Sequence, residues 1–329
     1  MKPFYLTQFK IAAALGLFLA FQSCVLVPGS WKNDKISSGK RDDFHTLNNG
    51  ALKYLKANDP KGLVPFLSKD MIAANNERTV EQISIELKAH DYTLMDEFYV
   101  VNKSMGDDTI LAKGPEITRY GLKYPYKTTE MYFAFFTPKT SDNKYMVSLI
   151  YGKFDYGWKI IKMDVQRYTM NGKTAPELFA LAKDQYEKKE YQASLNNISL
   201  AIDCFKPNEY FQYPDEVDAA PFYNKVRDKV NETYHYPLIL RQVSTGPMIL
   251  RVYNDESDEG SYPMIYYMTH FPLKDTSAVK KENIEIRKAV GKMFPALDEN
   301  NNYILYSAFN ERPTGYSTVG HFDMKIKAH

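Results

Sequence analysis

The sequence predicts an α+β protein made of successive folded parts behind an amino-terminal export signal. Helical periodicities fill residues 42–89, and aromatic and aliphatic runs typical of strands then continue to residue 170. Helices followed by strands recur after residue 173. This segregated order favours antiparallel sheets with covering helices over a parallel α/β sheet. The predicted parts are a signal at 1–23, a spacer at 24–41, an α+β domain at 42–172, a helical linker at 173–235 and a second α+β domain at 236–329.

Composition indicates an ordinary globular protein and excludes one class of partner. Hydrophobic residues make up 44% of the 329 residues and charged residues 25%. Cleavage before Cys24 would remove Lys2 and Lys10 and no acidic residue, which leaves 40 basic and 40 acidic side chains. A nucleic-acid partner is therefore not expected, because such proteins usually carry a clustered basic surplus.

The amino terminus carries an export signal that ends at a cysteine. Lys2 is followed by the apolar run 11–21, then by Ser23 and Cys24. This segment resembles a bacterial lipoprotein signal peptide, which implies cleavage between Ser23 and Cys24 and acyl chains on Cys24. The lipid bilayer would then be a partner of the protein. A plain secretory signal and a retained anchor stay open, although the run is shorter than the ~20 residues that span a bilayer.

The residues after Cys24 indicate at which membrane the protein is expected. No acidic pair follows the cysteine, so the resemblance implies an outer-membrane site that faces the periplasm. Residues 24–41 contain Pro, Gly and Ser with little periodicity, which predicts a flexible spacer. Trp31 has two interpretations, namely an aromatic at the membrane interface or a side chain packed on the first domain.

The first domain is expected to open with helices. Phe44, Leu47, Ala51 and Leu55 share one helical face after two aspartates, and Pro60 can begin a second, short helix. A third helix is predicted from Thr79, because Gln82 three residues later completes a capping-box pattern.

Strands are predicted at 91–103, 128–137, 145–154 and 158–170. The middle of the second, 131–136, is apolar on both faces. With Gly157-Trp158-Lys159-Ile160 after the last hairpin turn, this order resembles the NTF2-like fold, in which a curved sheet wraps a helix around a conical pocket. Enzymatic members of that family place an Asp and a His in the cone. The resemblance therefore implies His90, Asp91 and Asp96 as pocket candidates, and a solvated helix end is the alternative for His90 and Asp91.

The helical part contains one hairpin with a family resemblance. A helix opens at Ala175-Pro176-Glu177, and the pattern Leu181-Ala182, Tyr191 and Ala201 resembles a single tetratricopeptide (TPR) hairpin. Ser194 departs from that pattern, which usually has Ala. One hairpin predicts a packing unit, and a partner-binding surface is the alternative. A further helix is expected at 220–233.

The last part predicts an antiparallel sheet with one covering helix. Strands are expected at 238–243, 248–253, 262–271, 303–309 and 319–326, and a helix capped by Asp275 separates the third strand from the fourth.

Catalytic and metal-binding motifs do not assemble in the sequence. Ser317 only approaches a nucleophile elbow, and residues 254–260 only approach a calcium loop and instead predict a hairpin. The histidines are scattered, so neither a metal nor a cofactor is expected. Cys204 is expected to be a buried, small apolar residue. The aromatic clusters at 210–213 and 234–236 favour core packing over a sugar-stacking face.

These observations predict a non-catalytic envelope lipoprotein that acts as a binding or scaffold module for an envelope protein or a small ligand. The alternative is a small-molecule binder or an enzyme of the hydrolase or isomerase type that uses the NTF2-like cone. Enzymatic activity is the less favoured of the two.

Overall fold

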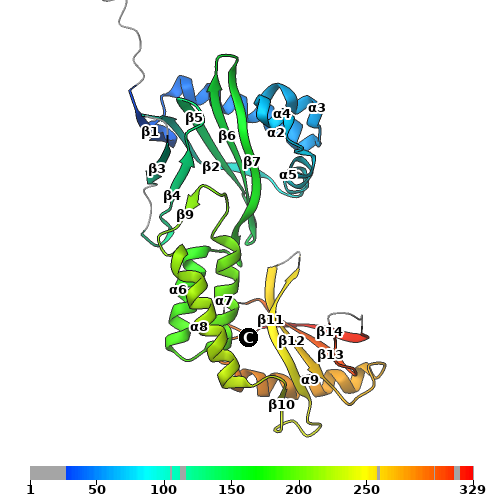
Figure 1. Ribbon diagram of the computed structural model, residues 1–329. Helices are drawn as coiled ribbons and strands as arrows, with labels where there is room; N and C mark the ends of the chain where they lie inside the picture. Colours follow the sequence, from blue (N-terminus) through cyan, green and yellow to red (C-terminus); the bar gives the residue numbers. More distant parts are fainter. Residues whose placement is uncertain are drawn as a thin grey trace, which may run out of the picture.

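The computed structural model describes residues 27–103, 106–111, 116–257, 260–299, 301–314 and 319–328. Over these residues the chain is mixed α+β, as predicted, with two sheet-containing halves joined by a group of helices (Figure 1). Ser23, Cys24 and Ser317 lie outside the described residues, so the interpretations placed on them stay predictions.

The first half is built on a curled antiparallel sheet with helices on one face (Figure 1). In spatial order its strands are β1 (Gly29–Lys32), β2 (Tyr92–Val101), β5 (Glu130–Pro138), β6 (Lys144–Phe154), β7 (Gly157–Met170) and β8 (Lys173–Thr174). The helices on that face are α2 (Ser38–Ala57), α3 (Pro60–Leu63), α4 (Lys69–Ala73) and α5 (Glu77–Ala89).

Strand β5 separates two hydrophobic cores. All of its residues are buried, and successive side chains point to opposite faces of the sheet. Even-numbered residues such as Tyr132 pack against the helices α2–α5, whereas odd-numbered residues such as Phe133 pack against the layer on the other side. The prediction of a strand that is apolar on both faces is therefore confirmed.

The predicted flexible spacer is wrong for residues 29–41, which are folded. Strand β1 pairs with β2, and Trp31 lies opposite Tyr99 with the two ring centroids 5.4 Å apart in a stacked arrangement. Ile36 is buried, and α2 begins at Ser38. Trp31 thus packs on the first half. Two apolar residues in a polar segment form no periodic pattern, so the contact with β2 was not visible in the sequence.

Helix starts differ from the expectation in one place and agree in another. Helix α5 begins two residues before Thr79, so the predicted capping box does not form. At α3, Pro60 occupies the first turn and the Asp59 carboxylate accepts a hydrogen bond of 2.9 Å from the Gly62 amide, as expected for a proline-initiated helix. The single-turn helix α4 was not predicted, because one turn is too short to show a period.

A second layer covers the other face of the large sheet. It contains a small antiparallel sheet of β3 (Asp107–Leu111), β4 (Gly121–Pro125) and β9 (Phe211–Gln212), together with α6 (Ala175–Glu187), α7 (Tyr191–Cys204) and α8 (Glu216–Tyr234). The small sheet was not predicted. Strand β9 is only two residues long and pairs with β4 across a long stretch of chain, so no local pattern marks it.

The predicted helical hairpin of α6 and α7 is confirmed. Its assignment to the TPR fold is a more specific prediction, which the presence of a hairpin alone does not test. The Glu177 carboxylate accepts a hydrogen bond from the Thr174 amide at 2.8 Å, which forms a capping box at the start of α6. The hydroxyl of Ser194 on α7 donates a 2.7 Å hydrogen bond to the carbonyl of Ala182 on α6. Helix α8 begins before Ala220 and continues through Pro221, so the predicted start at 220 is wrong.

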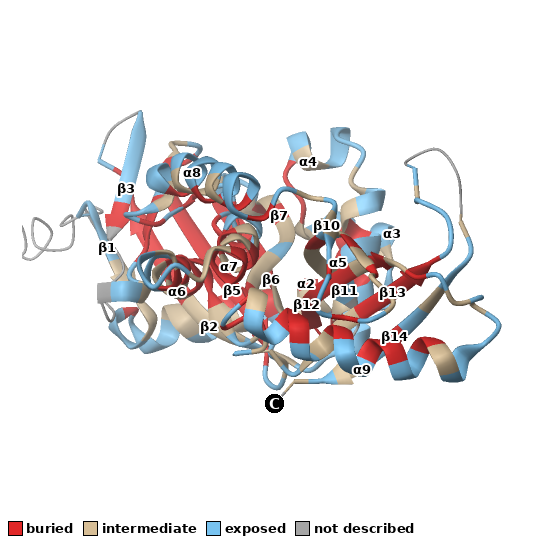
Figure 2. Cartoon of the chain, turned by 90° about the horizontal axis from the view of Figure 1, so that it is seen from below, coloured by how far each residue is buried: buried red, intermediate tan, exposed pale blue. Residues whose placement is uncertain are grey.

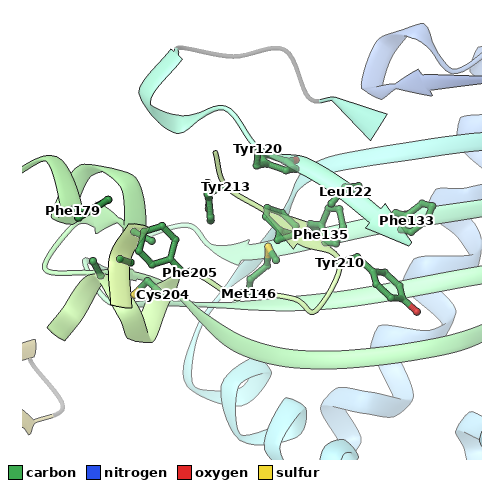
Figure 3. Packing of buried hydrophobic residues seen from close by; sticks show 14 of the residues in the cluster. Tyr120, Leu122, Phe133, Phe135, Met146, Phe179, Cys204, Phe205, Tyr210 and Tyr213 are labelled. Carbon is green, nitrogen blue, oxygen red and sulfur yellow. The ribbon is translucent and has the colours of Figure 1, made fainter. Parts of the chain in front are cut away.

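The helices share a core with the large sheet rather than forming a separate linker. Figure 3 shows Cys204, Phe205 and Tyr213 converging with Phe135 of β5 in that core. Phe211 is fully buried, which confirms core packing over a sugar-stacking face for residues 210–213. Cys204 is also fully buried, as predicted, and burial raises the pKa of its thiol to about 12.

The second half contains a mixed sheet, which corrects the expected antiparallel one. In spatial order its strands are β10 (Leu238–Ile239), β11 (Met248–Ser257), β12 (Gly260–Met268), β13 (Tyr303–Phe309) and β14 (His321–Lys327). Strands β12 and β13 are parallel, because the connecting helix α9 (Thr276–Met293) returns the chain to the start of the neighbouring strand. The single covering helix, capped by the Asp275 side chain, is confirmed.

Helix α7 lies between the two halves and is buried from both sides. It packs on β7 of the first half and on β11 of the second. The Asn254 side-chain amide donates a 2.7 Å hydrogen bond to the Asn196 carbonyl, and the Gln192 amide donates one of 3.4 Å to the Val252 carbonyl. Figure 2 shows buried residues along α7 and on the strands to either side.

Candidate functional site

The predicted pocket residues His90 and Asp91 do not meet in a cavity. His90 is the carboxyl-terminal cap of α5, and both side chains are exposed. Neither lines any of the best-formed cavities in the described part of the chain. The solvated helix end is therefore the interpretation that the structure supports.

Asp96 lies on the other side of the sheet, where its carboxylate is fully engaged. It pairs with the Lys32 ammonium at 2.8 Å and accepts hydrogen bonds from the Asn33 amide at 2.9 Å and the Tyr120 hydroxyl at 2.6 Å. A bulge between Leu94 and Asp96 turns this side chain toward the small sheet. Asp96 therefore fastens the amino-terminal segment to the sheet and does not face α2.

Aromatic side chains fill the space between α2 and the large sheet. The rings of Phe44 and Tyr132 stack with centroids 3.9 Å apart, and the Trp158 ring packs edge-on against Phe44 at 5.0 Å. Tyr151 lies beside Tyr132 and is fully buried. In an NTF2-like cone this space would hold the ligand, whereas here it is a packed core.

A polar network missed by the sequence analysis crosses this core. The buried Glu97 carboxylate lies 3.1 Å from His45 Nε2 and accepts a 2.7 Å hydrogen bond from the Tyr132 hydroxyl, which itself accepts one of 2.8 Å from the Asn48 amide. Burial and the bond to Glu97 raise the pKa of Tyr132. His45 and Asn48 are three residues apart on α2, and Glu97 shares a strand face with Tyr99, so periodicity could assign each residue to a face but could not bring the two elements together.

A carboxylate paired with an imidazole is a common acid–base unit. The His45 side chain is 41% exposed, so one edge of the ring reaches solvent. However, neither His45 nor Glu97 lines one of the best-formed cavities among the described residues.

A second buried carboxylate, Glu130, lies on the same sheet face at the start of β5. Glu130 contacts the ammonium groups of Lys40 and Lys153 at 3.2 and 3.3 Å, and accepts a 2.5 Å hydrogen bond from the Tyr99 hydroxyl. Burial acts to raise the pKa of Glu130, but the hydrogen bonds from Tyr99 and Lys40 and the two lysine charges outweigh it and lower the pKa. This cluster ties α2 to β5 and is saturated with partners.

The second half contains an open groove with the features of a binding site. It is a cavity of about 420 Å³ between the carboxyl-terminal half of α9 and strands β13 and β14. The two strands are neighbours in the sheet (Figure 1). This volume falls within the range of small-molecule sites, about 300–1,000 Å³. Its apolar lining is formed by Ile284, Val290, Phe294, Leu297, Ile304, Tyr306 and Ile326.

Four basic residues and one acid also line this groove, which we call the α9 groove. The basic residues are Arg287, Lys288, Lys292 and Lys327, and the acid is Asp298. Lys288 is paired with Glu285 at 2.8 Å. Ile284 is 51% exposed at the same site, although large apolar side chains are usually buried. An apolar lining with surplus positive charge favours a ligand that is both apolar and anionic.

A larger cavity of about 490 Å³ among α6, α7 and α8 is a weaker candidate. Tyr186, Tyr191 and Phe222 line it, but the Lys225 ammonium already lies 4.4 Å from the centroid of the Tyr186 ring. The aromatic surface there is partly covered by the protein's own cation.

Over the described ranges, no cluster of three or more His, Cys, Asp or Glu side chains is arranged to hold a metal ion. None of the helices in those ranges has the length and hydropathy of a membrane-spanning segment. Comparison of the chain with protein-family models, with curated proteins and with solved structures finds no match.

Proposed function

We propose that this protein is a bacterial envelope lipoprotein, held at the outer membrane and facing the periplasm, that binds its ligand without catalysing a reaction. The signal-like segment that ends at Ser23 and Cys24 supports the lipid anchor. The curled sheet around α2 supports an NTF2-like first half, and the hairpin of α6 and α7 supports a single TPR-like unit.

The α9 groove is the observation that carries the binding function. It combines apolar walls with more basic than acidic side chains, and it belongs to a half that α7 joins firmly to the amino-terminal half. A ligand with an acyl chain or similar apolar portion and a negative head group fits this chemistry, because the walls remove apolar surface from water while the rim pairs the charge.

Binding of dodecanoate to the full chain tests this function. Lys292→Glu and Lys327→Glu reverse two charges that line the groove, and together they are expected to weaken binding by about tenfold or more. Lys281→Glu is the matched control, since Lys281 is exposed on α9 but does not line the groove. The proposal would be contradicted if wild type, the double variant and Lys281→Glu bound dodecanoate equally. It would also be contradicted if wild type bound dodecanol as tightly as dodecanoate.

The lipid anchor has a separate test. Cys24→Ser is expected to release the protein from membranes of its native host and to remove the mass of the acyl chains, whereas Cys204→Ser leaves both unchanged. Cys204 is a suitable control because it is fully buried and lies far along the chain from the signal. A Cys24→Ser protein that stays membrane-bound would contradict the proposed lipid anchor.

The pair of His45 and Glu97 supports a second candidate, an enzyme or small-molecule binder of the first half. The 3.1 Å contact and the partial exposure of His45 suit proton transfer with a small substrate at the surface. A hydrolase or isomerase activity that is lost in His45→Asn, while the unfolding midpoint is unchanged, would establish this candidate over the first.

A further inference from the structure

A β-bulge in β11 turns an arginine away from the core of the second half. Ile249 pairs with Tyr267 and Arg251 pairs with Tyr266, so Leu250 is an extra residue without a partner in β12. Ile249 and Val252 both lie in the core under α9. In a regular strand Arg251 would share the face of Ile249, but the extra residue places it on the opposite face.

On that face two tyrosines hold the Arg251 guanidinium. Its central carbon lies 4.4 Å from the centroid of the Tyr253 ring and 4.3 Å from that of Tyr266. The two rings contact each other edge-on at 5.2 Å, and Phe309 supports Tyr266 from β13 at 4.8 Å. Stacking between rings limits the rotation of the guanidinium, so little conformational entropy remains to be lost on binding.

A second arginine reaches the same place from the segment after β13. A cavity of about 190 Å³ lies here and is lined by both arginines, Arg251 and Arg312, and by Leu250, Tyr266, Pro313 and Thr314. Asn310 anchors the start of this segment, because its side-chain amide donates to the carbonyls of Thr269 and Phe271 at 3.0 and 2.8 Å. These bonds fix the chain two residues before Arg312.

The electrostatic balance of this cavity is one-sided. Two guanidinium groups line it, and none of its described lining residues is acidic. Elsewhere in the chain Arg167 and Arg227 form ion pairs with carboxylates, but no ion pair is seen for Arg251 or Arg312 within the described residues. The lining of the cavity is therefore positively charged, which favours an anionic ligand.

We propose that Arg251 and Arg312 form a binding site for the phosphate group of a phosphorylated ligand. A guanidinium matches phosphate oxygens with two parallel hydrogen bonds. A phosphate monoester carries about −1.5 to −2 charges at pH 7, which balances two arginines better than a single carboxylate does. The cavity of about 190 Å³ is smaller than the usual site for a whole small molecule, so it takes the charged group of a larger ligand.

This site is distinct from the α9 groove. Tyr267 points into the core beneath α9, and its neighbour Tyr266 points to the other face of the sheet, where Arg251 lies. The two sites therefore occupy opposite faces of one sheet and are separable by mutation.

Calorimetric titration of the full chain with inorganic phosphate and with glycerol 3-phosphate tests the proposal. Arg251→Gln and Arg312→Gln are each expected to weaken binding by about tenfold, since each removes a charge-assisted pair. Arg251→Lys keeps the charge but loses the planar fork, so a smaller loss is expected. Arg227→Gln is the control, because Arg227 lies on α8 and pairs with Asp228 at 2.9 Å.

Vesicles that contain phosphatidic acid, whose head group is a phosphate monoester, form the arm that separates the two sources of phosphate. Vesicle binding that disappears in the double variant Arg251→Gln, Arg312→Gln identifies a lipid head group. Binding of glycerol 3-phosphate without vesicle binding identifies a water-soluble ligand, and either result supports the site. The proposal is overturned if wild-type protein binds phosphate no better than acetate, or if the double variant binds as wild type while its unfolding curve is unchanged.

Discussion

Arg167 on β7 forms an ion pair with Glu256 on β11 and thereby joins the two halves of the molecule. Its guanidinium also lies 3.3 Å from the Asp203 carboxylate on α7 and donates a 3.0 Å hydrogen bond to the Tyr145 hydroxyl. One side chain thus contacts both sheets and the helix between them. Arg167 is therefore one of the polar contacts that join the second half to the first.

Replacing Arg167 should loosen that junction. Arg167→Gln leaves the carboxylates of Asp203 and Glu256 near each other without a cation, so we expect a loss of about 1–2 kcal/mol in the free energy of unfolding. Denaturant unfolding measures it, with Arg227→Gln as the control because that residue forms its ion pair with its sequence neighbour Asp228. Equal stability of the two variants would mean that the ion pairs of Arg167 do not stabilise the junction.

Removal of the hydroxyl should have different effects on the free energy of unfolding at two buried tyrosines of the first half. The Tyr132 hydroxyl bonds to Glu97 and Asn48, so Tyr132→Phe removes one of the hydrogen bonds to the buried Glu97 carboxylate and the acceptor of the Asn48 amide, and should cost about 1–3 kcal/mol. The Tyr151 hydroxyl is buried and has no hydrogen-bond partner among the described residues. Tyr151→Phe should therefore be neutral or stabilising. Unfolding midpoints of the pair decide this, and a matching loss in both would refute the assignment of the network.

The serine that departs from the TPR pattern should make a measurable contribution. Ser194 donates to the Ala182 carbonyl on the neighbouring helix, whereas Ser199 donates to Leu195 within its own helix. Ser194→Ala should lower the free energy of unfolding by about 1 kcal/mol. Ser199→Ala should change it by less, because a bond within one helix adds no contact between helices. The reverse order would show that the inter-helix bond does not stabilise the hairpin.

Acid should lower the free energy of unfolding through protonation of Glu130. The pKa of Glu130 is lowered in the folded state from an ordinary value of 4.5, so between these two pKa values the unfolded chain binds the extra proton. The stabilisation is therefore complete above the unfolded value and is lost as pH falls below about 4.5 through the folded pKa. Glu130→Gln should be less stable at pH 7 and show a shallower decline between pH 5 and pH 3. Parallel pH profiles for the two proteins would contradict this.

Local patterns were sufficient for the elements that span several turns or several strand residues. Helices α2 and α9 carry an apolar stripe along their length, and β5 is apolar on both faces, so their existence and burial could be predicted. The parallel pairing of β12 and β13 was also within reach, since a helix that connects two adjacent strands favours it.

Short elements and sites were not predictable in this way. Strands β1 and β9 contain four and two residues and exist because β2 and β4 pair with them. The pair of His45 and Glu97 and the convergence of Arg251 with Arg312 join residues that are far apart in the chain. No spacing rule links such residues, because their proximity results from the packing of whole elements.

The amino-acid order alone specifies the α+β class, the long helices and strands with their buried faces, and the signal-like segment that ends at Cys24, because each is a local pattern of apolarity and charge. Tertiary packing decides the rest. It fills the space beneath α2 with aromatic rings, engages Asp96 with Lys32, and exposes an apolar groove on one face of the second sheet and two arginines on the other. These outcomes depend on which surfaces meet, and that relation is set by the burial of three cores at once.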